Sequence, residues 1–142
     1  MPAILIMSAS ILATCSLLDP PQPEYAAAGD PISSTDAPAQ SAPIRVTGEQ
    51  ALEMSSGDII IVDVRNRDEF DAGHIEHAIL LPVDEIASRV STVLPDKNQA
   101  ILLYCRSGAR SSRAALVLVE MGYTRVYDLG AFTNWQGSVI YP

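Results

Sequence analysis

The most informative stretch of this 142-residue sequence is Ala100-Ile101-Leu102-Leu103-Tyr104-Cys105-Arg106-Ser107-Gly108-Ala109-Arg110-Ser111. Its first part, Ala100–Tyr104, is a continuous run without charge, which is typical of a parallel strand that is covered on both faces. Cys105 follows that strand directly. After a short loop, the segment from Ser111 to Met121 predicts a helix that is apolar on almost every side and therefore buried. Strand, tight loop and helix in this order indicate an α/β protein.

Four more strands are predicted on either side of this unit. The runs that predict them are Ile44–Val46, Ile59–Val62, Ala78–Leu81 and Arg125–Tyr127. Because these short strands alternate with predicted helices, we expect an α/β fold, a three-layer α/β/α sandwich with a mostly parallel five-stranded sheet.

The helices between the strands have recognisable starts. Thr47 and Gln50 fit a capping box, so a helix is expected to run to about Ser55. Asp84 is expected to cap a second helix. Its apolar residues recur at helical spacing, at Ile86, Val90, Val93 and Leu94. A short helix carrying Trp135 is expected near the end of the chain.

Composition excludes several classes of protein. The net charge of −8 argues against a nucleic-acid partner, because phosphate contacts need clustered cations. The chain has only two cysteines, and its two histidines are His74 and His77. This set cannot supply the four ligands of a structural zinc site, so no metal is expected.

Residues 1–43 differ in composition from the rest of the chain. They contain no Lys or Arg and hold seven of the ten prolines. The uncharged apolar stretch at 1–18 predicts a signal peptide or lipoprotein signal, although secretory signals normally open with a cation. Residues 19–43 are rich in Pro, Ala and Ser and predict a flexible tether. Residues 44–142 then form the folded domain.

Cys15 leaves the fate of this leader open. Residues 12–15 resemble a bacterial lipobox, in which the Cys is lipidated, but Thr14 departs from the Gly, Ala or Ser preferred there. Cleavage after the alanines at 26–28, an uncleaved anchor and no export at all are the alternatives. We expect a periplasmic or cell-envelope protein that is tethered to the membrane through Cys15, and otherwise a secreted one.

The loop after Cys105 suits an anion site around a thiolate. In a tight loop that opens a helix, successive backbone N–H groups can point inward, and Gly108 permits the backbone angles required. Arg106 and Arg110 add positive charges, and Arg113 lies one turn further on. Such a field favours the thiolate, which is the competent nucleophile. Cys105 is therefore predicted to be a nucleophile, with an inert core cysteine as the alternative.

These segments resemble the rhodanese family of sulfurtransferases. Residues 105–110 are similar to the family's six-residue active-site loop. Further similarity lies in Ile61–Arg65, Glu69–Phe70, Gly73–Ile75 and Val126–Gly130, with Ala131 in place of a common glycine. The resemblance covers residues 44–142 and implies a single-domain rhodanese fold.

The resemblance also implies an activity. A thiosulfate sulfurtransferase moves a sulfane sulfur from thiosulfate, a polysulfide or a persulfide to a thiol or cyanide, here through a persulfide on Cys105. The residues implied to bind the anionic donor are Arg106, Ser107, Gly108, Ala109, Arg110 and Ser111. No metal or organic cofactor is implied. We expect a monomer that contacts the membrane only through its N-terminus.

Several alternatives remain. Asp63 and Arg65 end a strand at the same sheet edge as Cys105, so they either touch the site or pair nearby, with Glu69 as a plausible partner of Arg65. A sulfur carrier or redox-sensing module with little turnover is a second function. A phosphatase or arsenate reductase of the same fold is a third. The four residues between Cys105 and Arg110 count against it, because those phosphatases place five there.

Overall fold

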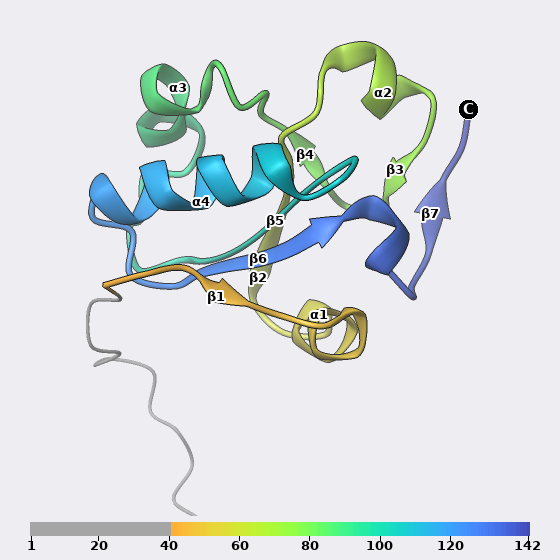
Figure 1. The fold of residues 1–142 in the computed structure, drawn as a ribbon, viewed down its shortest axis with the longest axis horizontal. Coiled ribbons are helices and arrows are strands. Elements are labelled where there is room, and N and C mark those ends of the chain that lie inside the picture. The colour runs from red at the N-terminus through yellow and green to blue at the C-terminus, as the bar shows by residue number, and fades with distance from the viewer. Residues whose placement is uncertain (1–40) are drawn as a thin grey trace, which may run out of the picture. The chain divides into compact units, whose positions relative to one another are not determined.

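A sheet of five short parallel strands forms the centre of the domain (Figure 1). The computed structural model describes residues 41–142, so the expectations for residues 1–18, for Cys15 and for residues 19–40 of the tether lie outside the described residues. The strands in chain order are β1 (Ile44–Arg45), β2 (Ile59–Asp63), β4 (Ile79–Leu80), β5 (Ala100–Cys105) and β6 (Val126–Ala131). Their order across the sheet is β1-β6-β5-β2-β4, and every pair is parallel.

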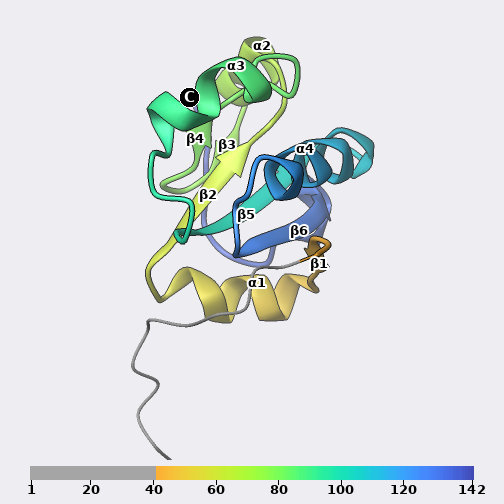
Figure 2. The ribbon, with the colours of Figure 1, turned by 90° about the vertical axis from the view of Figure 1, so that its left-hand side faces the viewer.

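Helices cover both faces of this sheet. They are α1 (Gly48–Ser55), α2 (Arg67–Asp71), α3 (Ile86–Val93), α4 (Ala109–Glu120) and the short 3-10 helix η1 (Phe132–Asn134). Figure 2 shows α1 on one side of the strands and α3 and α4 on the other. The predicted three-layer α/β/α sandwich with a mostly parallel five-stranded sheet is confirmed.

The central strand β5 packs both layers because its side chains alternate between the faces. Ile101 and Leu103 belong to the cluster formed with α3 and α4, while Leu102 and Tyr104 belong to the cluster beneath α1. All six residues of β5 are buried. This strand therefore carries Cys105 out of the middle of the core to the carboxyl edge of the sheet.

The capping prediction holds for one helix and fails for another. Thr47 accepts a hydrogen bond from the Gln50 N–H, and the Gln50 side chain accepts one from the Thr47 N–H, as predicted for α1. Asp84 does not cap α3. Glu85 holds the N-cap position with helical backbone angles and no side-chain cap, and Asp84 instead accepts a hydrogen bond from Arg113 at 2.7 Å.

Other expectations need correction. Helix α4 begins at Ala109, earlier than expected, and has an exposed side on which Leu116 is 53% exposed, so it is not buried all round. Strand β6 runs on to Ala131, beyond the predicted Tyr127. Trp135 follows η1 and is half-buried against the α1 cluster.

Three elements were not predicted. Helix α2 is one, and the others are β3 (His74–Ile75) and β7 (Val139–Ile140), which pair in an antiparallel ribbon apart from the main sheet. Within residues 41–142, no helix is long and apolar enough to cross a membrane.

Candidate active site

Cys105 lies at the end of β5, where the chain turns into α4. Its sulfur accepts a hydrogen bond from the Gly108 N–H at 3.0 Å and another from the Ser111 N–H at 3.4 Å. The Ser111 hydroxyl lies 3.8 Å from the same sulfur. Cys105 is fully buried, whereas Arg106, Ser107 and Ala109 are exposed. The loop thus forms a cradle of donors with the sulfur at its floor, as the sequence predicted.

Gly108 and Ser111 give the loop its shape. Gly108 has a φ of 98°, in the left-handed region that glycine adopts without strain. It stands at the N-cap of α4 and has no side chain to cap the helix. The buried Ser111 hydroxyl donates to the Gly108 carbonyl at 3.0 Å. The uncapped amides at this helix end are therefore free to face Cys105.

This cradle favours the thiolate. Burial raises the pKa of the Cys105 thiol, because it disfavours the charged form. The backbone N–H groups of Ser111 and Gly108, the Ser111 hydroxyl and the Ser107 N–H act in the opposite direction. Together they outweigh burial and lower the pKa of Cys105 below its ordinary value. Hydrogen bonds to the anion thus make Cys105 a better nucleophile at neutral pH.

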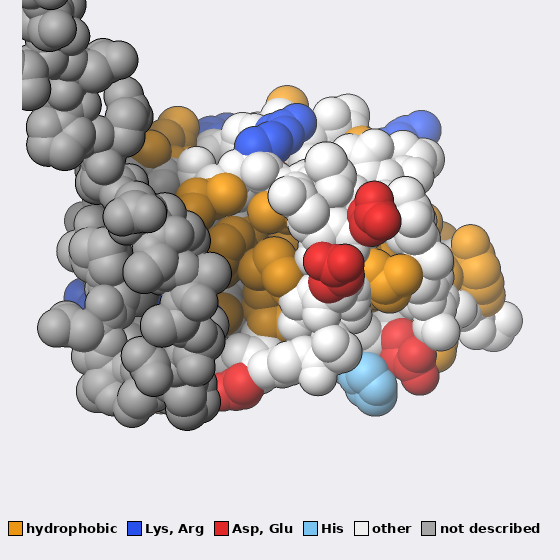
Figure 3. Space-filling view, turned by 90° about the horizontal axis from the view of Figure 1, so that it is seen from below, with side chains coloured by type: hydrophobic (Ala, Val, Ile, Leu, Met, Phe, Trp, Pro, Cys, Tyr) orange, Lys and Arg blue, Asp and Glu red, His pale blue; other side chains and the backbone are white. Residues whose placement is uncertain are grey.

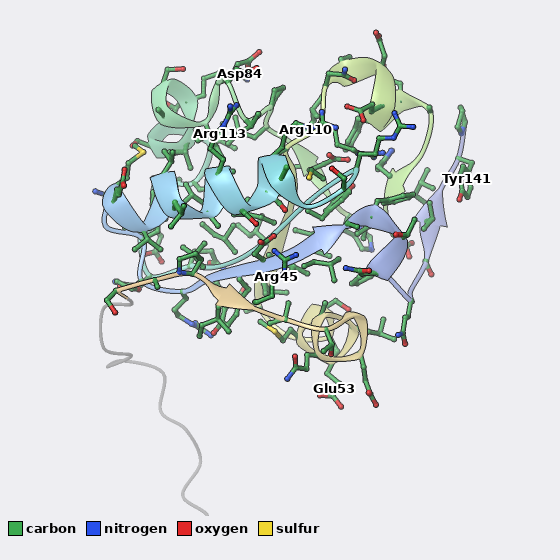
Figure 4. The ribbon with its side chains drawn as sticks, in the orientation of Figure 1. Arg45, Glu53, Asp84, Arg110, Arg113 and Tyr141 are labelled. Carbon is green, nitrogen blue, oxygen red and sulfur yellow. The ribbon has the colours of Figure 1, made fainter. Side chains whose placement is uncertain are left out.

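The two loop arginines have different environments. Arg110 forms a bidentate ion pair with Glu69 of α2, with Nη1–Oε2 and Nη2–Oε1 distances of 2.6 and 2.8 Å. Figure 4 shows Arg110 on the first turn of α4. The hydrogen bond from Arg110 lowers the pKa of Glu69 to about 2 against the effect of burial. Arg106 is exposed and forms no ion pair with any described residue.

Asp63 and Arg65 pair with each other rather than reaching the sulfur. The Arg65 guanidinium donates to Asp63 Oδ2 at 2.6 Å and to the Gly73 carbonyl at 2.7 Å, and both side chains are buried. The Arg65 guanidinium also lies over the rings of Tyr104 and Phe132, at 5.5 and 4.8 Å from their centroids. Glu69 as the partner of Arg65 was a wrong expectation, since Glu69 pairs with Arg110.

Beneath the loop, a network that the sequence did not reveal joins β1, α4 and β6. Arg45 donates to Asp128 Oδ2 at 2.7 Å and to the Ser112 hydroxyl at 3.0 Å, and Ser112 also donates to Asp128 at 2.8 Å. Asp128 Oδ1 accepts the Gly130 N–H at 2.9 Å. Arg45 is labelled in Figure 4. Arg45 lies 67 positions from Ser112 and 83 positions from Asp128 in the sequence, so no local sequence pattern indicates these contacts.

The remaining charged and histidine residues lie outside the cradle. Arg113 pairs with Asp84 at 2.7 Å (Figure 4). His74 Nδ1 lies 3.0 Å from the Phe70 carbonyl, and its ring stacks on Phe70. His77 is exposed. Among the described residues, no three His, Cys, Asp or Glu side chains gather in a way that could hold a metal ion.

A hollow of about 730 Å³ lies elsewhere on the surface. Its lining includes Leu52, Ile59, Val93 and Trp135 but no residue of the Cys105 loop. Figure 3 shows apolar side chains gathered on the face seen from below. The size of this hollow says nothing about the chemistry, because the donors converge on Cys105 and not here.

Comparison with known proteins agrees with this geometry. The sequence model of the Rhodanese-like domain family matches residues 47–138. The chain belongs to the rhodanese-like domain family. It is similar to the thiosulfate sulfurtransferase PspE of Escherichia coli (strain K12), with 39% identity over 73 residues, 51% of this chain and 70% of the relative. A sulfurtransferase of Allochromatium vinosum is 39% identical over 79 residues, 55% of this chain and 72% of that protein.

The solved structures support the same membership. A rhodanese from E. coli determined with anions has a TM-score of 0.57 and 32% identity, and the match covers 59% of this chain and 99% of that one. The sequence-based resemblance to single-domain rhodaneses is thus confirmed. These relatives support a rhodanese-type sulfurtransferase.

Proposed function

We propose that this rhodanese transfers a sulfane sulfur from an anionic donor, with thiosulfate as the first candidate, to a thiophilic acceptor. Cys105 carries the sulfur between the two as a persulfide. The observation that carries the proposal is the pair of N–H···S hydrogen bonds from Gly108 and Ser111, which favour a thiolate at the end of β5. Thiosulfate is the first candidate donor because relatives of this chain are named thiosulfate sulfurtransferase.

The first half-reaction forms the persulfide. The Cys105 thiolate attacks the sulfane sulfur of thiosulfate, a new S–S bond forms, and the S–S bond of the donor breaks. Sulfite leaves with the electron pair of the broken bond. Arg106 and the N–H group of Ala109 bind the anionic end of the donor and stabilise the departing sulfite. Since the nucleophile is already a thiolate, this step needs no general base.

The second half-reaction regenerates the thiolate. An acceptor nucleophile, such as cyanide or a thiolate, attacks the outer sulfur of the persulfide, and the S–S bond to Cys105 breaks. With cyanide the product is thiocyanate. The negative charge returns to Cys105, where the N–H groups of Gly108 and Ser111 stabilise it again. The cycle consumes neither a metal nor an organic cofactor.

Steady-state kinetics with thiosulfate and cyanide tests this function. Because one product leaves before the second substrate reacts, double-reciprocal plots at several cyanide concentrations are expected to be parallel. Cys105→Ser is expected to keep the fold and abolish turnover, whereas Cys15→Ser keeps the activity. Residual activity of Cys105→Ser above about a few per cent of wild type contradicts the covalent role of this thiol.

Complete burial of Cys105 favours a second candidate, a sulfur carrier with little turnover. A carrier accepts one sulfur from thiosulfate and holds it until a specific protein acceptor arrives. Slow thiocyanate formation together with a long-lived persulfide identifies this behaviour. Hydrolysis of a phosphate ester, which the four-residue spacing from Cys105 to Arg110 disfavours, is measured in the same series.

A further inference from the structure

Glu69 occupies a position where the helix cap does not require a charge. In α1, the uncharged Gln50 side chain accepts the N–H of the N-cap residue Thr47 at 2.9 Å. In α2, the Glu69 carboxylate accepts the N–H of Asn66 at 3.3 Å in the same kind of capping box. An amide oxygen therefore suffices for this cap. The negative charge of Glu69 is left for another role.

That charge is directed at the sulfur loop. Both Glu69 oxygens accept hydrogen bonds from the Arg110 guanidinium, and the two side chains are 21% and 33% exposed. Arg110 belongs to the loop that carries Cys105, and its positive charge interacts favourably with the Cys105 thiolate. The pair thus compensates a cation that lies next to the candidate nucleophile.

Arg106 is in the opposite situation. It is exposed and forms no ion pair with a residue of the described part of the chain. Of the two loop arginines, one is therefore compensated by Glu69 and the other is free to meet a donor. The positive electrostatic field at the loop is therefore weaker than the two arginines alone would produce. It depends on Glu69 of α2, which lies 41 positions away from Arg110 in the sequence.

We propose that Glu69 determines the specificity of the sulfur site for the charge of the donor. By pairing with Arg110, it compensates one of the two loop cations. The preference of the site for binding a doubly charged donor over a singly charged one is therefore smaller than it would be with both cations uncompensated. Glu69 acts through Arg110 and does not touch the reacting atoms. This inference rests on the proposed function of Cys105 as the sulfur acceptor.

The first test measures the thiol itself and does not depend on turnover. Alkylation of Cys105 by iodoacetamide, an uncharged reagent, is followed against pH in wild type and in Glu69→Gln, which keeps an acceptor for the α2 cap. The midpoint is expected at lower pH in Glu69→Gln, because Arg110 then stabilises the thiolate without compensation. Asp71→Asn is the matched control, since it removes a paired carboxylate from the same helix.

A double variant shows whether the effect passes through Arg110. In Glu69→Gln/Arg110→Gln neither charge is present, so the midpoint is expected to return close to that of wild type. A shift that persists in the double variant overturns the proposed route. An unchanged midpoint in Glu69→Gln overturns the proposal itself. Urea unfolding of each variant shows whether the fold is retained.

The second test compares two donors of different charge. In Glu69→Gln, the KM for the dianion thiosulfate is expected to fall about two- to fivefold, the effect of one charge in a partly exposed site. The KM for the monoanion methanethiosulfonate is expected to fall less. Equal changes for both donors contradict charge selection. If neither donor is used even by wild type, the proposed function fails, while the alkylation midpoints still decide the effect of Glu69 on the thiol.

Discussion

Replacing Gly108 by alanine separates backbone strain from chemistry at the sulfur. Gly108 has a φ of 98°, and an added Cβ would lie 3.4 Å from Arg45 Nη2 and 3.5 Å from Gly130 Cα, which are ordinary contacts. The cost in folding free energy therefore comes from the left-handed backbone, about 1–2 kcal/mol for a residue with a Cβ. Gly122 is the matched control, because it has a φ of 90° and an added Cβ there would lie 3.7 Å from Lys97 Nζ, again an ordinary contact.

The two substitutions differ in their effect on Cys105. The N–H of Gly108 donates to the sulfur at 3.0 Å, whereas the N–H of Gly122 donates to the Val119 carbonyl. If the strained loop relaxes and this bond to the thiolate is lost, the thiolate loses about 1.5–3 kcal/mol of stabilisation. The pKa of Cys105 is therefore expected to rise, because the anion loses one of the hydrogen bonds that lower it.

Two measurements check this prediction. Urea unfolding is expected to show a similar loss of stability in Gly108→Ala and Gly122→Ala. The pH dependence of Cys105 alkylation is expected to move to higher pH only in Gly108→Ala, together with a loss of sulfur transfer at neutral pH. If the alkylation midpoint is the same in both variants, the Gly108 N–H does not stabilise the thiolate, contrary to the role of the cradle described above.

Three further predictions rest on the structure, and a fourth rests on the sequence of residues 1–18. Arg65→Met leaves the buried Asp63 carboxylate without its guanidinium partner and is expected to lower the free energy of unfolding in urea by about 3–5 kcal/mol. A loss below about 1 kcal/mol would mean that this ion pair does not stabilise the fold. Arg106→Ala is expected to raise the KM for thiosulfate about tenfold, the effect of one charge-assisted hydrogen bond, and to affect an uncharged donor less; an equal effect on both means that Arg106 shapes the loop. The pKa of Glu69 is lowered from 4.5 to about 2, so its ion pair with Arg110 adds stability above pH 4.5 that is lost as the pH falls towards 2. The difference in unfolding free energy between wild type and Glu69→Gln is therefore expected to shrink over that range. Membrane association of the full chain is expected to depend on Cys15 in cell fractionation, and equal recovery of wild type and Cys15→Ser in the soluble cytoplasm contradicts the lipid tether.

The sequence predicted those strands and helices whose formation depends on residues close together in the chain. The continuous apolar runs at Ile59–Val62 and Ala100–Tyr104 became β2 and β5, because strands buried on both faces need apolar residues at every position. The capping box at Thr47 placed the start of α1. The cradle around Cys105 was also predictable, since its donors lie within six residues of the sulfur.

Contacts between distant segments were not predictable in the same way. Nothing in the sequence distinguishes Arg65 from Arg110 as the partner of Glu69, because the choice depends on where α2 lies relative to α4. The pairing of β3 with β7 joins segments about 65 positions apart and has the same origin. Helix α2 is different, since the Asn66–Glu69 capping box was readable in the sequence and would have predicted its start.

Mass spectrometry of the full chain after treatment with thiosulfate detects the proposed Cys105 persulfide itself. A gain of about 32 Da, one sulfur atom, is expected on the peptide that carries Cys105, with loss of that mass after addition of cyanide. The peptide that carries Cys15 is expected to stay unchanged. An unmodified Cys105 peptide after thiosulfate alone, in a preparation that forms thiocyanate once cyanide is added, or a sulfur found on Cys15 instead, contradicts the persulfide at Cys105.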